Sequence, residues 1–186
     1  MLYGRCKGCT KVIKIPFWCS TCNSKRFQKD FDKWTSGNNH VDKFIQESQL
    51  NRNYDEVLEW IPYNRLRNIQ YLAKGGFSTI YKAIWLDGNI RKWSYDEGKW
   101  TRHNREWNYD EKKWIYNITK IDVALKSLNK SSNLSDEYFF NKLTSLSEHF
   151  NIFSRSVRLY GFTQNPKNLD YMMVIKFEDV DCWIKR

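Results

Sequence analysis

The chain of 186 residues is poor in the two residues that interrupt regular structure, with 8 glycines and 3 prolines. This scarcity excludes collagen-like and low-complexity classes. No apolar run approaches the roughly 18 residues that a membrane-spanning helix needs. The first 14 residues carry Lys and Arg along their length instead of the apolar centre of a secretory signal. We therefore expect an intracellular, cytoplasmic protein that has no membrane partner.

Aromatic side chains and positive charge are abundant instead. The chain holds 9 Trp, 11 Tyr and 11 Phe, and 31 Lys and Arg outweigh 21 Asp and Glu to give a formal net charge of +10. So many large apolar rings argue against disorder throughout and indicate a packed core. The 3 histidines (His40, His103 and His149) lie in no recognisable nucleophile or metal constellation, which disfavours a hydrolase.

Four of the 5 cysteines form two C-x-x-C pairs with nine residues between them, namely Cys6, Cys9, Cys19 and Cys22, and Cys182 lies far away. In a reducing compartment this spacing favours a tetrahedral metal site, because each tight turn aims two thiolates at one ion. Disulfides and redox thiols are the alternatives, although no βαβ pattern surrounds the pairs. We predict a structural zinc module over residues 1–29. Four cysteine ligands leave no open position for zinc catalysis.

The predicted zinc module is strongly basic. It contains no acid and seven cations, which are Arg5, Lys7, Lys11, Lys14, Lys25, Arg26 and Lys29. A basic zinc module can bind nucleic acid through phosphate contacts. A protein-docking surface and a simple solvated knuckle remain open beside that interpretation, because charge alone identifies no specific partner.

Residues 30–65 have the pattern of a helical linker. Phe27, Phe31 and Trp34 recur at helical spacing before a polar break, and a second helix is predicted from Val41 to Gln49. Their apolar faces are most simply core or docking surfaces.

Two predicted strands flank a small-residue turn that contains Gly75 and Gly76. Such a turn lets backbone N–H groups approach phosphate oxygens without interference from a Cβ. Further along, Val-Ala-Leu-Lys at 123–126 reads as an apolar strand that ends in Lys126. A lysine on the buried side of a strand is costly unless it is paired with an opposite charge.

These features together resemble the N-terminal lobe of a eukaryotic protein kinase. The resemblance rests on Leu-Ala-Lys-Gly-Gly-Phe-Ser-Thr-Ile-Tyr-Lys-Ala at 72–83, the strand at 123–126, Val-Arg-Leu-Tyr-Gly-Phe-Thr at 157–163, Asn-Pro at 165–166 and Tyr-Met-Met-Val-Ile at 171–175. With the cysteine pairs and Trp-Ile-Pro-Tyr-Asn-Arg-Leu at 60–66, the chain is similar to the tyrosine-kinase-like families of arbuscular mycorrhizal fungi.

The resemblance implies an α+β fold, in which an antiparallel five-stranded sheet plus helix C follows the zinc ribbon or knuckle and the linker. The kinase-like lobe would cover residues 66–186. ATP is the implied cofactor and partner. The implied nucleotide-binding residues are Gly75, Gly76 and Phe77 over the phosphates, Ile80 and Ala124 against adenine, Lys126 on the α- and β-phosphates, Ile175 as gatekeeper and Phe177 in the hinge.

The sequence also departs from the kinase pattern. Ala73 and Ser78 replace two glycines of the glycine-rich loop, and the helix predicted at 134–146 places Asn141 or Lys142 where the family has a glutamate. The H-R-D, D-F-G and A-P-E motifs do not occur in the 186 residues. We therefore expect a truncated or degenerate kinase domain, a pseudokinase, that does not transfer phosphate by itself. A non-enzymatic zinc-module adaptor for protein or nucleic acid is the alternative.

Residues 89–120 form an insert that contains an internal near-repeat. The unit W-x-Y-D-E-x-K-W occurs at 93–100 and again at 107–114. Acidic turn residues flanked by Trp and Tyr predict a hairpin that extends the sheet of the lobe. Its tryptophans can stabilise the hairpin as cross-strand pairs. Stacking on single-stranded nucleic acid is the competing interpretation.

Overall fold

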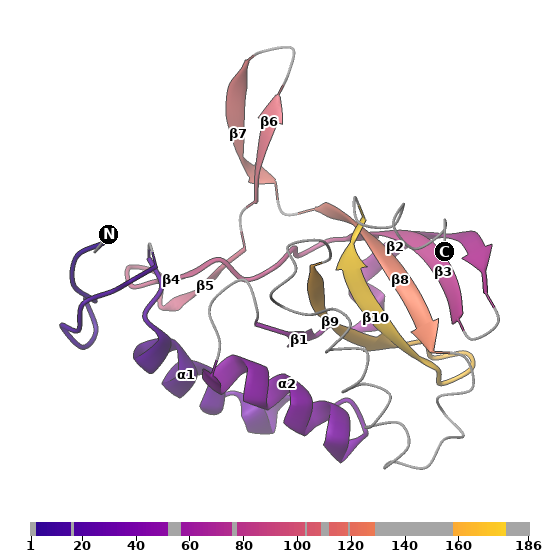
Figure 1. Ribbon diagram of the computed structural model, residues 1–186, viewed down its shortest axis with the longest axis horizontal. Helices are drawn as coiled ribbons and strands as arrows, with labels where there is room; N and C mark the ends of the chain where they lie inside the picture. Colours follow the sequence, from indigo (N-terminus) through magenta and orange to yellow (C-terminus); the bar gives the residue numbers. More distant parts are fainter. Residues whose placement is uncertain are drawn as a thin grey trace.

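The computed structural model describes residues 3–15, 17–51, 57–75, 78–102, 104–108, 112–118, 120–128 and 158–177. Its centre is a sheet with helices below it, and a small cysteine-containing module lies at one end (Figure 1). The α+β class predicted from the sequence is confirmed. None of the helices within these ranges is long and apolar enough to cross a membrane.

The sheet has six strands in the order β1-β9-β10-β8-β3-β2. Their bounds are β1 Glu59–Trp60, β2 Leu66–Lys74, β3 Ser78–Trp85, β8 Ile121–Leu128, β9 Leu159–Gln164 and β10 Tyr171–Lys176. The five long strands pair antiparallel, as predicted, whereas β1 pairs parallel with β9. The prediction of five strands was therefore one short, because β1 has two residues and shows no alternating pattern.

Side chains of the central strands are buried on both faces of the sheet. Along β8, Val123 and Leu125 enter one core, while Ala124 and Leu128 enter the other. This division follows from the alternation of side chains along a strand. The first core contains Trp85, Tyr160 and Met172 among others. The second core is completed by helix α2.

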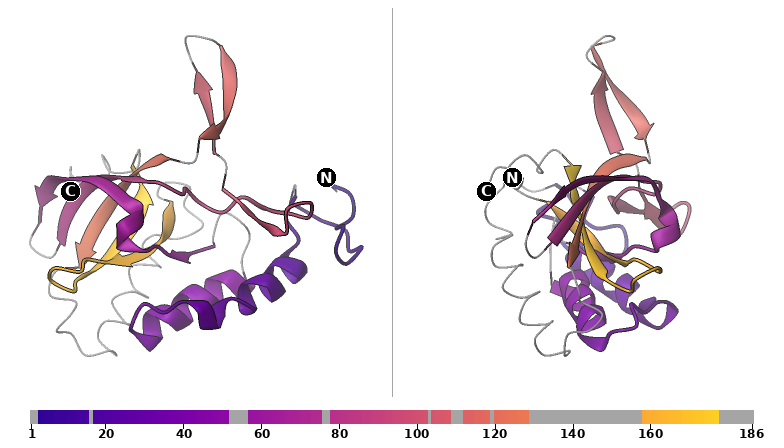
Figure 2. Two further views of the ribbon diagram at one scale, coloured as in Figure 1. Left: turned by 180° about the vertical axis from the view of Figure 1, so that it is seen from behind. Right: turned by 90° about the vertical axis from the view of Figure 1, so that its right-hand side faces the viewer.

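Helix α2 (Asn39–Asn51) packs beneath the sheet, as Figure 2 shows from two further directions. Its residues Val41 and Ile45 are fully buried in the core that contains Phe162, Tyr171 and Met173. At its start, the Asn38 Oδ1 accepts hydrogen bonds from the backbone N–H of His40 at 2.8 Å and of Val41 at 3.2 Å. An asparagine cap of this kind fixes the start of a helix. The predicted helix at 41–49 is confirmed.

The first helix lies earlier in the chain than the apolar spacing indicated. Helix α1 covers Ser20–Gln28, and a 3-10 turn, η1, follows at Phe31–Lys33. The helix begins directly after Cys19, so the second cysteine pair supplies its first turn. Phe27 is buried beside Trp18, which fixes the helix against the N-terminal module. A second 3-10 turn, η3 (Tyr63–Arg65), leads into β2.

The insert between β3 and β8 forms two hairpins, and the prediction that it extends the central sheet is wrong. Strands β4 (Lys92–Ser94) and β5 (Lys99–Thr101) form one two-stranded sheet, and β6 (Asn104–Asn108) and β7 (Lys113–Ile118) form another. Each copy of the repeat makes one hairpin, and the cross-strand pairs Trp93–Trp100 and Trp107–Trp114 are in register, as expected. Hairpin β4–β5 lies beside the N-terminal module, whereas β6–β7 projects away (Figure 1).

An ion pair at the root of the insert explains why the first hairpin leaves the sheet. The Arg102 guanidinium forms an ion pair with the Glu59 carboxylate in β1 and donates a 2.7 Å hydrogen bond to the Gly88 carbonyl. The second carboxylate oxygen accepts the N–H of Ile90 at 3.2 Å. Both ends of the segment from residue 88 to residue 102 are thereby held at β1, which directs the hairpin between them towards the N-terminal module.

Several predicted features lie outside the described residues. They include the helix expected at 134–146 with Asn141 and Lys142, the loop residues Gly76 and Phe77, and the lone Cys182.

Candidate metal centre

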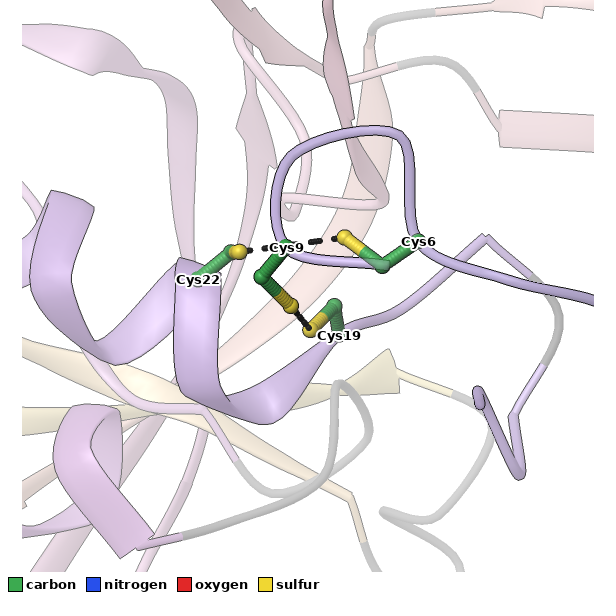
Figure 3. Close-up of side chains that lie close together, drawn as sticks. All are labelled: Cys6, Cys9, Cys19 and Cys22. Carbon is green, nitrogen blue, oxygen red and sulfur yellow. Dashed lines mark hydrogen bonds between the residues drawn. The ribbon is translucent and has the colours of Figure 1, made fainter. Parts of the chain in front are cut away.

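The four cysteines of the two C-x-x-C pairs converge on one point (Figure 3). All four Sγ atoms lie within 4.8 Å of one another. The Sγ atoms of Cys6 and Cys22 are 3.7 Å apart, and those of Cys9 and Cys19 are 3.6 Å apart. A tetrahedron with Zn–S bonds of 2.3 Å has edges of about 3.8 Å. The cluster therefore has the donor set and spacing of a tetrathiolate site, and the four cysteines are free rather than disulfide-bonded.

The first pair sits in a tight turn that the backbone itself stabilises. The Thr10 N–H donates to the Cys6 carbonyl at 2.9 Å, and the Gly8 N–H donates to the Cys6 Sγ at 3.3 Å. The Cys6 N–H bonds the Lys11 carbonyl at 2.8 Å, which closes the turn onto the next segment. Thr10 takes a φ of 59°, in the left-handed region that reverses the chain. These contacts aim the Cys6 and Cys9 thiols in one direction.

The second pair is positioned by the start of helix α1. Cys19 is the N-cap residue and Cys22 lies in the first turn, where the Asn23 N–H donates to the Cys19 carbonyl at 2.9 Å. The two side chains therefore leave the same end of the helix. N–H groups at this end carry partial positive charge, which favours thiolate ligands.

Burial and hydrogen bonding shift the pKa values of the thiols in different directions. Burial opposes ionisation of Cys6, but hydrogen bonds from the Tyr95 hydroxyl and the Gly8 N–H outweigh it and lower its pKa to about 6. Burial, followed by thiol contacts with Cys9 and Cys6, raises the pKa of Cys22 to about 12. Burial also raises the pKa of Cys19. The cluster thus favours one thiolate at Cys6, and a metal must displace protons from its neighbours.

Hairpin β4–β5 contributes a contact to the cluster from far along the chain. The Tyr95 hydroxyl lies 3.1 Å from the Cys6 Sγ, although the two residues are 89 positions apart. A Cβ at Gly8 would approach the same hydroxyl to 2.9 Å, so a larger residue there would push the Tyr95 hydroxyl away from its position beside Cys6. The chemistry of metal thiolates favours such a donor beside the ligand, because it stabilises the sulfur charge.

Aromatic stacking holds the same hairpin against helix α1. The Trp100 ring stacks on Phe27 with 4.5 Å between centroids and on Trp18 with 5.9 Å. The Arg26 guanidinium lies 4.5 Å from the centroid of Trp93 and 5.0 Å from that of Tyr95. The predicted role of the tryptophans in stabilising the hairpin is therefore accompanied by a second role, which is to attach the hairpin to the cysteine module.

The residues expected to face a nucleotide lie on one face of the central sheet. Ile80, Ala124 and Ile175 are buried in the same core, and Phe177 packs against it. Lys126 is half-buried and lies between Ala124 and Leu128 on β8, so alternation places it on that face. Its neighbours across the sheet are Ile80 and Met173, which belong to the same core.

The glycine turn is described only in part. Gly75 donates a 2.8 Å hydrogen bond from its N–H to the Ser78 carbonyl, as a hairpin turn requires. Gly76 and Phe77 lie outside the described residues, so their expected position over a phosphate stays a prediction.

Three residues of these sites were missed by the sequence reasoning. Tyr95 and Asn23 lie at the cysteine module, and Lys82 lies on the sheet face, with its Nζ 2.7 Å from Asp122 and 4.4 Å from the Phe177 ring centroid. The W-x-Y repeat was a signal for Tyr95, but it did not indicate a target. No pattern marked Asn23.

No family model matches this chain, and a search of the curated proteins finds no match either.

Proposed function

We propose that the sheet face formed by Ile80, Ala124 and Lys126 binds a nucleotide, as the N-terminal lobe of a protein kinase does. The observation that carries this proposal is the convergence of five expected positions from β3, β8 and the end of β10 on one face. Those positions come from segments that are more than 40 residues apart in sequence. Their convergence is what the resemblance requires.

The chemistry of the face supports a nucleotide. Ile80, Ala124 and Ile175 are apolar, as the residues around a purine ring usually are, and they are buried in the core that helix α2 completes. The same face carries Lys126, which is half-buried, and Lys82 lies beside Ala124 across the β3–β8 pairing. A cation beside apolar side chains matches the phosphates and the base of ATP, although Lys82 is already paired with Asp122.

Nucleotide titration with a thermal-shift readout tests this proposal. ATP at a hundredfold excess over its Kd stabilises a protein by about 2.7 kcal/mol, which corresponds to roughly 5–10 °C for a chain of this size. We expect Lys126→Ala to abolish the shift and Lys167→Ala, in the exposed turn before β10, to retain it. No shift in the intact chain, or equal shifts in both variants, contradicts the proposal.

We also propose that the cysteine cluster holds a structural Zn²⁺. The four thiols supply a complete tetrahedral ligand set, and their spacing matches that of Zn–S bonds. A bound ion would fix the turn at Cys6 and Cys9 to the start of helix α1.

Metal analysis of the purified chain tests the zinc proposal. We expect one zinc per chain in the intact protein and in Cys182→Ser, and a loss of most of the metal in Cys9→Ser. A tetrathiolate site substituted with Co²⁺ gives intense absorption from thiolate coordination, which provides a second readout. Equal metal contents in Cys9→Ser and Cys182→Ser refute this assignment.

A further inference from the structure

A cavity of about 370 Å³ lies where the cysteine module meets hairpin β4–β5. It is independent of the nucleotide-binding face proposed above. Its wall combines cations, aromatic rings and a buried amide, and its volume falls in the range of small-molecule sites, about 300–1,000 Å³. Arg5, Lys7 and Phe17 line it from the module, and Lys92 and Trp93 line it from the hairpin.

The buried amide is that of Asn23, which lines the cavity at 2% exposure. Its Oδ1 accepts a 2.7 Å hydrogen bond from the Arg26 guanidinium, and because Arg26 can only donate, the orientation of the amide is fixed. The Nδ2 has no hydrogen-bond partner among the residues that the structure describes. A buried donor without a partner costs roughly 1–3 kcal/mol. The cavity therefore favours a ligand that brings a hydrogen-bond acceptor.

The charge of the wall favours an anion. Arg5, Lys7 and Lys92 are exposed at the cavity, and Asp96 is the only acid among the side chains that line it in the described part of the chain. Residues 1–29 supply no acid to compensate for their seven cations. Lys and Arg side chains are the usual partners of phosphate groups in proteins, and their charges neutralise those of the phosphates.

Aromatic surface is presented at the same place. Phe17 is 73% exposed, which is unusual for a phenylalanine, and its φ of 62° lies in the left-handed region that bulky residues avoid. Strain of this kind is retained where the surrounding structure imposes it, and it is concentrated at binding sites. The Lys92 Nζ lies 5.0 Å from the Phe17 ring centroid, so a cation accompanies the exposed ring. Trp93 adds a half-buried indole that Arg26 holds in place.

We propose that this cavity binds one nucleotide unit of a single-stranded nucleic acid. The base stacks on Phe17 or Trp93 and accepts a hydrogen bond from the Asn23 Nδ2, while Arg5, Lys7 and Lys92 contact the adjoining phosphates. Aromatic stacking beside a basic track is how proteins hold single strands. A duplex is unsuitable, because its bases are already stacked and paired. An acidic peptide would satisfy the cations but leave the exposed ring without a planar partner.

Fluorescence anisotropy of the zinc-loaded chain with labelled ten-residue oligothymidylate and oligouridylate tests the proposal. We expect Phe17→Ala to weaken binding by about tenfold or more. The double variant Lys7→Ala, Lys92→Ala should reduce the slope of log K against log salt by about 1.4, since each phosphate contact on a single strand contributes about 0.7. Asn23→Asp keeps an acceptor for Arg26 but replaces the free donor with an oxygen, and it should weaken binding more than Phe17→Ala.

One variant in each hairpin, at a residue that does not line the cavity, serves as a control. Trp107→Ala changes the second copy of Trp93, and Lys99→Ala removes a hairpin lysine that does not line the cavity. Both should bind as the intact chain does, and the Co²⁺ absorption of every variant reports an intact metal module. Absence of binding at 50 mM salt overturns the proposal, as does an equal loss in Phe17→Ala and Trp107→Ala.

Two competition arms separate other binding modes. Displacement of the oligonucleotide by polyglutamate at equal charge concentration would show an acidic-polypeptide site and overturn the proposal. Displacement by ATP that is lost in Lys126→Ala would place the oligonucleotide on the sheet face and overturn it as well. We expect polyglutamate not to displace the oligonucleotide, and any displacement by ATP to persist in Lys126→Ala. The sheet-face proposal can fail without affecting this result.

Discussion

Removal of the Trp100 side chain should weaken metal binding at a site that this residue does not touch. Trp100 stacks on Phe27 and Trp18. It also meets Trp93 edge-on, with 5.2 Å between the Trp100 and Trp93 ring centroids. The contacts with Phe27 and Trp18 hold hairpin β4–β5 on the cysteine module and helix α1, and the hairpin in turn brings the Tyr95 hydroxyl to Cys6. Trp100→Ala therefore removes the attachment that keeps this donor beside the thiolate.

The magnitude follows from the contacts. Each aromatic pair contributes about 0.5–1.5 kcal/mol beyond area burial, so the two pairs of Trp100 with Phe27 and Trp18 give roughly 1–3 kcal/mol. Because Trp100 is half-buried, we take about 2–3 kcal/mol as the free energy with which its side chain holds the hairpin in place. If the hairpin docks only on the metal-bound module, this whole amount appears in the affinity for zinc, because linked equilibria share their free energy. Each 1.4 kcal/mol corresponds to tenfold, so zinc affinity should fall by about 30–150-fold.

Competition with a chromogenic chelator measures this affinity directly. Trp114 occupies the same position in the second copy of the repeat, and hairpin β6–β7 projects away from the cysteine module. Trp114→Ala is therefore the matched control, and its affinity for zinc should equal that of the intact chain. Release of zinc from Trp100→Ala and Trp114→Ala at the same chelator concentration would show that docking of the hairpin does not contribute to metal affinity.

Three further predictions concern backbone packing, charge and protons. Gly161→Ala should lower the free energy of unfolding by at least about 3 kcal/mol in urea titration, because φ is 153° there and a Cβ would lie 1.9 Å from the Glu59 carbonyl oxygen; a smaller loss contradicts the packing of β1 on β9. Arg102→Ala should cost about 3 kcal/mol by leaving the Glu59 carboxylate without its cation, and Glu59→Gln in the same chain should recover part of the loss. Zinc affinity should rise at least about tenfold per pH unit between pH 6 and 8, because burial raises the pKa values of Cys19 and Cys22 and their protons must leave; an affinity independent of pH would argue against thiolate ligation.

Local patterns predicted the parts of the fold that depend on neighbouring residues. The spacing of the cysteines sufficed to predict their cluster, because each C-x-x-C turn is a local structure and one ion accepts both turns. Apolar and β-branched runs predicted three of the long strands, β2, β3 and β8, whereas the five-stranded sheet was implied by the kinase resemblance. The register that pairs Trp93 with Trp100 and Trp107 with Trp114 followed from the repeat, because the two tryptophans of each copy flank its acidic residues.

Local sequence patterns did not predict the contacts between distant segments. The pairing of β1 with β9 depends on the bare backbone of Gly161, which accommodates the Glu59 main chain, and a two-residue strand has no pattern to detect. The course of hairpin β4–β5 away from the sheet depends on the Arg102–Glu59 ion pair, whose partners are 43 positions apart. The apolar spacing of Phe27 and Phe31 predicted a continuous helix, but α1 starts at the cysteine turn and ends at Gln28.

Cys6 contacts one residue that is near in the sequence, Cys22, and one that is distant, Tyr95. This difference determines which contact forms first during folding. Cys22 is 16 positions from Cys6, whereas Tyr95 is 89 positions away. Closing the longer loop costs about 1.5 kcal/mol more, at roughly 0.6 kcal/mol for each doubling of length. During synthesis the cysteines also leave the ribosome long before the hairpin does. The four cysteines would therefore take up the proposed metal while they are still a short nascent segment, and the later hairpin would close over a centre that is already formed.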